Sequence, residues 1–183
     1  MLNIDLDFDE YKKLENKNVP LIKKEDLPEE FTQKAYSIII DFIQKTKCLD
    51  YEWVIYFDYC TGEILRCVKG KDNQVRLYFE DDEFEGKHIV SMHNHPINAF
   101  SPPSGKNFNI LLRAFEDYEL IVGRDGLWIL KAKRIHNDLI EDVREASFVY
   151  YILTLSRCAD LKGKMEIKLN VKTHYMVVCY QIL

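Results

Sequence analysis

The stretch HIVSMHNHPINAFSPPSGKNFN, residues 88–109, decides the fold class that we expect for this chain. Its first residues form a short apolar run that predicts a strand, and the strand leads directly into His93, Asn94, His95 and Pro96. Side chains alternate along a strand, so both imidazoles leave it on the same side and can share one metal ion. The proline keeps the chain extended at His95, so the loop can turn back toward a third ligand.

The third ligand is expected at Asn107, at the start of the next helix. A catalytic zinc site uses three protein ligands and keeps one position open for water. An amide oxygen can bind a metal, but zinc prefers carboxylate, imidazole or thiolate, so weaker binding is expected than with an aspartate. Ser104 is well placed to cap this helix. A helix over residues 107–117 is predicted by apolar side chains at helical spacing: Phe108, Leu111, Leu112 and Phe115.

The remaining elements follow from periodicity and turn residues. The polar residues 1–27 are interpreted as an N-terminal arm that packs loosely or docks on a partner, residues 28–135 as the main domain, and residues 136–183 as additions that pack on it.

Helices are predicted over residues 28–45, with Pro28 in the first turn, and 138–161. Strands are predicted on both sides of Thr61-Gly62, over residues 74–79, in a hairpin over residues 119–133, and over residues 171–183, where a short helix is the alternative.

This combination resembles the JAMM metalloproteases, also called JAB or MPN domains. Their signature is H-x-H-P, a short loop, then S-x-x-D, which is matched by residues 93–96 and by residues 104–107, with asparagine in place of the aspartate. The local spacing is similar to the bacterial, archaeal and phage-borne branch, and the resemblance covers residues 51–133. It implies an α/β fold with a mixed, curved β-sheet flanked by helices, a sandwich related to that of cytidine deaminases. The deaminases themselves require H-x-E with P-C-x-x-C, which this chain lacks.

The resemblance also implies a site and a reaction. The family carries a glutamate on an early strand that takes a proton from water and passes it to the leaving amine, and Glu52 occupies the matching position. His93, His95 and Asn107 would hold zinc, while Ser104 would donate to the oxyanion, cap the helix, or both. The function that this implies is a zinc-dependent peptidase or isopeptidase acting on a protein or peptide, possible substrates including ubiquitin-like conjugates.

Asn107 leaves other interpretations open. The site could be naturally degenerate, the aspartate could have been replaced deliberately to trap an active enzyme, or another residue could complete the metal site. The alternative function is a catalytically inactive MPN-like module that binds a partner protein through its acidic arm or a sheet edge.

Composition narrows the class of partner. The net charge of −5 and the pI of about 5.6 disfavour binding to nucleic acid, which weakens a third hypothesis of a DNA-processing accessory protein.

Five cysteines without a C-x-x-C pair indicate reduced thiols and a cytoplasmic protein, and no apolar run is long enough to span a membrane. His88, His136 and His174 are not expected to bind metal, and Asp58 and Asp125 suit turns.

Overall fold

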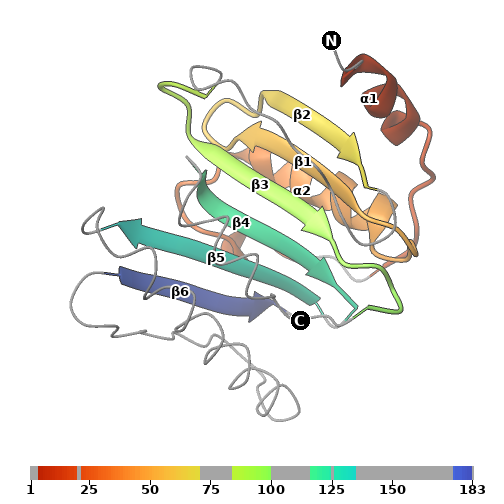
Figure 1. The fold of residues 1–183 in the computed structure, drawn as a ribbon. Helices are drawn as coiled ribbons and strands as arrows, with labels where there is room; N and C mark the ends of the chain where they lie inside the picture. Colours follow the sequence, from red (N-terminus) through yellow and green to blue (C-terminus); the bar gives the residue numbers. More distant parts are fainter. Residues whose placement is uncertain are drawn as a thin grey trace.

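A computed structural model describes residues 4–19, 22–70, 84–99, 116–124, 126–134 and 175–182. They form an α/β structure around a six-stranded mixed sheet with the order β2-β1-β3-β4-β5-β6 (Figure 1). Strands β3 and β4 are parallel, and every other neighbouring pair is antiparallel. The strands are β1 (Trp53–Asp58), β2 (Ile64–Lys69), β3 (Ile89–Asn94), β4 (Glu116–Gly123), β5 (Gly126–Arg134) and β6 (Tyr175–Ile182). The predicted α/β class with a mixed sheet is therefore confirmed.

The predicted hairpins are present. Strands β1 and β2 pair around the Thr61-Gly62 turn, where Gly62 has a φ of 72° that a side chain would disfavour. Strands β4 and β5 pair up to Gly123 and Gly126. At the C-terminal end, β6 pairs with β5, which decides between the strand and the short helix expected there.

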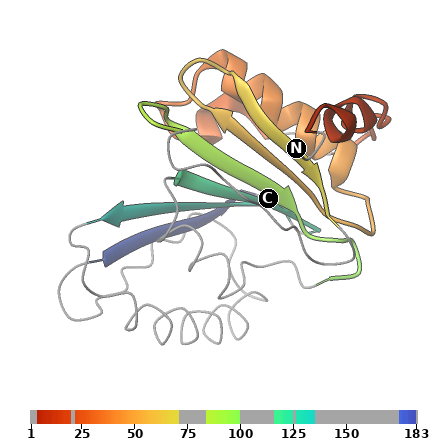
Figure 2. The ribbon, with the colours of Figure 1, turned by 45° about the horizontal axis from the view of Figure 1, so that its top comes forward.

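Helix α2 (Gln33–Thr46) covers one face of the sheet (Figure 2). It begins later than predicted, because Thr32 is extended and its hydroxyl accepts a hydrogen bond from the Ala35 amide, whereas Pro28 lies in a preceding turn. The buried side of α2 packs on one face of strands β1 and β3. The core there includes Ile39, Phe42, Trp53, Ile55, Phe57, Val90, Met92, Leu120 and Val122.

The N-terminal segment packs more closely than expected from its polar composition. Helix α1 (Ile4–Lys12) lies beside β2 (Figure 1), and the short 3-10 helix η1 (Lys24–Asp26) precedes α2. Tyr11 is only 2% exposed and joins the main core with Ile22 and Leu27. The interpretation of this segment as a loosely packed arm is therefore wrong, because a few apolar side chains among the charges reach the core.

Several predicted elements lie outside the described residues: the strand over 74–79, the helix over 138–161, and most of the helix over 107–117. The predicted end of the helix over 107–117 is wrong, because Glu116 is already the first residue of β4 and pairs with Ile89. No helix in the described part of the chain is long and apolar enough to cross a membrane.

Candidate functional site

The two histidines of the motif lie at the C-terminal end of β3. His93 is inside the strand and only 8% exposed, while His95 follows it and donates its backbone N–H to the Val122 carbonyl at 3.0 Å. Their ring centroids are 5.2 Å apart. Burial, together with His95, lowers the pKa of His93 well below its usual range, so this imidazole is neutral at pH 7 and keeps a lone pair for a ligand.

Glu52 directly precedes β1, the neighbour of the strand that carries the histidines. Val54 is the cross-strand neighbour of His93, and Glu52 precedes Val54 by two residues. The extended pairing reaches Glu52, since its carbonyl accepts the Gly70 N–H at 2.8 Å. Because side chains alternate along a strand, Glu52 is expected on the face of Val54 and His93.

Asn94, between the two histidines, fixes the backbone on both sides of Glu52. Its Oδ1 accepts the Trp53 N–H at 2.7 Å, and its Nδ2 donates to the Tyr51 carbonyl at 2.9 Å. Asn94 is fully buried. The Asn94 side chain thus makes the hydrogen bonds to the β1 backbone where pairing between β1 and β3 ends. It connects the backbone around Glu52 to the His-x-His segment.

A carboxylate lies directly behind His93. Glu119 of β4 is 2% exposed, and its Oε1 is 3.6 Å from His93 Nδ1. The contact runs diagonally across the parallel β3–β4 pair, in which Ser91 is the direct neighbour of Glu119. Neither Glu119 nor Asn94 was predicted from the sequence as a site residue. The available signal was a charged residue within the apolar run of a central strand.

A second buried carboxylate, Glu116, lies further along the same face. Ser91 donates its hydroxyl to Glu116 Oε2 at 2.6 Å. Burial raises the pKa of Glu116, and hydrogen bonds from Ser91 and Tyr56 lower it in part, leaving a value of about 7. At neutral pH this carboxyl is therefore partly protonated, unlike an ordinary glutamate.

The other predicted site residues, Ser104 and Asn107, lie outside the described residues. Within the described ranges, no group of three or more His, Cys, Asp or Glu side chains is arranged to hold a metal ion. The described part of the site is therefore a pair of imidazoles, with Glu52 next to the start of the neighbouring strand.

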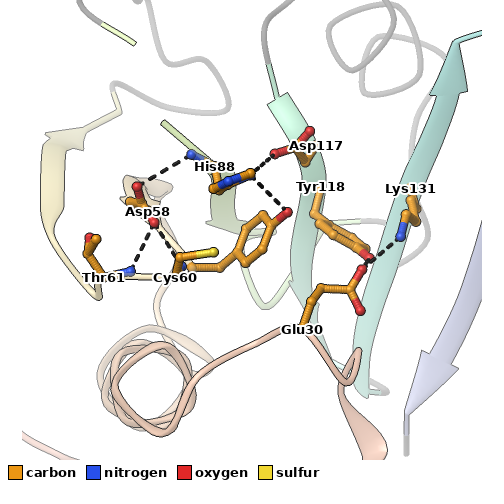
Figure 3. Close-up of polar contacts among 9 residues, drawn as sticks. Glu30, Asp58, Cys60, Thr61, His88, Asp117, Tyr118 and Lys131 are labelled. Atoms are coloured by element: carbon orange, nitrogen blue, oxygen red, sulfur yellow. Dashed lines mark hydrogen bonds and ion pairs between the residues drawn. The ribbon is translucent and has the colours of Figure 1, made fainter. Parts of the chain in front are cut away.

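A separate polar cluster occupies the opposite end of β3 (Figure 3). Asp58 accepts the backbone N–H groups of Cys60 at 2.8 Å and Thr61 at 3.0 Å. Burial raises the pKa of Asp58, but these hydrogen bonds and one from the His88 N–H outweigh it and lower the pKa. Asp58 therefore orders the β1–β2 turn, as predicted.

An exposed histidine–aspartate pair and a cysteine lie beside this turn. His88 Nδ1 lies 3.7 Å from Asp117 Oδ2, and both side chains are largely exposed. Burial and the neighbouring Asp58 raise the pKa of the Cys60 thiol, which works against a reactive thiolate. Cys48 and Cys60 are exposed free thiols, and Cys67 is buried.

Glu30 links the segment before α2 to the sheet in the same view (Figure 3). It accepts hydrogen bonds from the Tyr118 hydroxyl and, at 2.8 Å, from Lys131 Nζ. Burial raises its pKa, but the hydrogen bonds from Lys131 and Tyr118 outweigh this and lower it to about 2. These residues tie the helix layer to β4 and β5 and have a structural role.

Comparison of the chain with protein-family models, curated proteins and solved structures gives no match. The function is therefore inferred from the motif and from the geometry of its residues.

Proposed function

We propose that the chain is a JAMM-type, JAB/MPN-like zinc peptidase or isopeptidase that hydrolyses an amide bond in a protein or peptide. The observation that supports this proposal is the pair of neighbouring imidazoles of His93 and His95 at the end of β3, with Glu52 two residues before Val54, the cross-strand neighbour of His93. These are the residues that the motif resemblance assigns to the acid–base group and to two metal ligands. Ubiquitin-like conjugates belong to the substrate class that it implies.

The donor atoms fit zinc. Neutral imidazole nitrogen is a common zinc ligand, and His93 is held neutral beside His95. Asn107 would complete the ligand set with its amide oxygen, a weaker donor than carboxylate. When bound, zinc supplies Lewis-acid chemistry that makes water more acidic and polarises a carbonyl oxygen.

The protein residues supply proton transfer and orientation. Glu52 is half-buried at the entrance of β1, and its backbone is held from β2 by Gly70 and from β3 by Asn94. A carboxylate fixed in this way takes a proton from the attacking water and delivers it to the leaving nitrogen, a contribution of roughly 10²–10⁴-fold in rate. Ser104 would donate a hydrogen bond to the developing oxyanion.

The test combines metal analysis with cleavage assays. Protein prepared without chelators is expected to contain zinc, and His93→Ala and His95→Ala are each expected to lose it. Glu52→Gln is expected to keep zinc but to lose roughly 10²–10⁴-fold in the rate of isopeptide or peptide cleavage. His88→Ala, which changes an exposed histidine at the other end of β3, is the matched control and is expected to behave as wild type.

Asn107→Asp completes the design, because a carboxylate ligand should raise both zinc content and cleavage rate. If neither wild type nor Asn107→Asp contains zinc or cleaves any amide substrate, the proposal fails. That result would favour the metal-free interaction module.

A further inference from the structure

Glu119 lies where a charge is costly. It is 2% exposed in the middle of β4, and Leu120, Ile121 and Val122 after it are at most 1% exposed. Moving a carboxylate from water into such surroundings costs on the order of several kcal/mol unless other groups stabilise the charge. An aliphatic residue would suit this strand position better if packing alone mattered.

The orientation of His93 relates this carboxylate to the candidate metal site. The Oε1 atom of Glu119 faces Nδ1 of His93 at 3.6 Å. The other ring nitrogen, Nε2, is separated from Nδ1 by one ring carbon, so its lone pair leaves the ring in a different direction. His95, the second expected ligand, lies beside the ring, with its centroid 5.2 Å away.

We propose that Glu119 is a positioning residue that holds the His93 imidazole for metal binding through Nε2. This inference rests on the zinc site proposed above and adds a residue to it. Metal-binding histidines commonly present their second ring nitrogen to a carboxylate, which fixes the tautomer and the ring orientation and makes the ligating nitrogen more basic.

The contact acts through electrostatics in this structure. A distance of 3.6 Å is longer than a hydrogen bond, so the carboxylate attracts the Nδ1–H dipole rather than bonding to it directly. In buried surroundings such an attraction is stronger than in water. It favours the tautomer with the proton on Nδ1, and that tautomer leaves the lone pair on Nε2.

The first experiment measures zinc affinity by competition with a chromophoric chelator. Glu119→Gln keeps the shape and removes the charge, and it is expected to weaken zinc binding roughly 10- to 100-fold. The matched control is Glu116→Gln. Glu116 is a buried carboxylate on the same face as Glu119, and it accepts a hydrogen bond from Ser91. Its zinc affinity is expected to stay within about twofold of the wild-type value, since Glu116 has no proposed role toward His93.

The second experiment needs no metal and no variant. Two-bond ¹H–¹⁵N NMR correlations of the His93 ring distinguish its tautomers, and the metal-free wild type is expected to carry the proton on Nδ1. A ring protonated on Nε2 would overturn the inference even if Glu119→Gln failed to fold.

The outcomes separate the two proposals. If wild type binds zinc and Glu119→Gln binds it equally tightly, the role of Glu119 is disproved while the zinc site stands. If wild type binds no zinc, the proposed function fails and this inference fails with it.

Discussion

Single side chains at the end of β3 decide how the candidate site is assembled. His93 and His95 leave the strand on one side, as their spacing predicted, and Asn94 between them turns to the backbone of β1. The H-x-H spacing alone identified the two imidazoles because period-two alternation is a local property of a strand. The contacts of Asn94 and Glu119 join strands that are far apart in sequence, and no local pattern could predict them.

Asn94→Ala is expected to lower the free energy of unfolding by about 2 kcal/mol. The substitution leaves the N–H of fully buried Trp53 without its acceptor, and a buried donor without a partner costs about 1–3 kcal/mol. Urea denaturation measures the change. Asn98→Ala, an exposed asparagine in the following loop, is the control and should stay within about 0.5 kcal/mol of wild type. Equal effects of the two substitutions would contradict the role of Asn94.

Glu116 predicts a pH dependence of stability. Its pKa is raised from an ordinary value of 4.5 to about 7 in the folded state, so the folded protein holds this proton more tightly than the unfolded chain. The resulting stabilisation is complete below pH 4.5 and is lost as the pH rises through about 7. Glu116→Gln removes the titration, because glutamine stays neutral and can still accept the hydrogen bond from Ser91.

The comparison is made by urea unfolding at pH 5 and pH 8. Relative to Glu116→Gln, wild type should lose roughly 1–3 kcal/mol between these two pH values. Parallel behaviour of the two proteins would show that Glu116 does not titrate in this range.

At the scale of elements, β-rich runs and turn residues located the strands β1, β2, β4 and β5, and β-branched and aromatic residues located β6. Boundaries were less predictable. The start of α2 moved from Pro28 to Gln33 because Thr32 makes a tertiary contact as well as a local one: its hydroxyl caps the helix and also donates to the Tyr59 carbonyl at 2.9 Å. The predicted helix end at Asp117 was wrong for a similar reason, since Glu116 pairs with Ile89 of β3 and therefore belongs to β4.

Thr32→Ala is expected to destabilise the protein by about 1–2 kcal/mol. The substitution removes the cap of α2 and leaves the Tyr59 carbonyl without its hydroxyl donor. Thermal and urea unfolding measure the loss. Ser37→Ala is the control, because the Ser37 hydroxyl is exposed and donates to the Gln33 carbonyl of the preceding turn. Its free energy of unfolding should remain equal to that of wild type or rise slightly, since alanine is the better helix former.

At the scale of the whole molecule, the N-terminal segment belongs to the folded domain. Tyr11 of α1 packs its ring against Trp53 of β1, with centroids 5.6 Å apart, and donates its hydroxyl to Asp41 of α2 at 2.9 Å. One aromatic side chain thus joins α1, α2 and the sheet.

Tyr11→Ala is therefore expected to lower the free energy of unfolding by about 3–5 kcal/mol, the cost of removing a large buried ring. Chemical denaturation measures it, and Tyr11→Phe, which removes only the hydroxyl, should cost about 1 kcal/mol. Glu15→Ala is the surface control, because the Glu15 side chain is 86% exposed and its ion pair with Lys17 contributes little. A small effect of Tyr11→Ala would restore the interpretation of a loosely attached arm.

The amino-acid sequence by itself determined the α/β class, the hairpins and the pair of histidines on one side of a strand, because each depends on residues a few positions apart. The tertiary structure decided that Asn94 joins the backbone on both sides of Glu52 to the His-x-His segment and that Glu119 lies 3.6 Å from His93. Those relations depend on strand order and register. The order and register are set by the pairing between strands and by the packing of the central strands against α2, through contacts between residues that are distant along the chain.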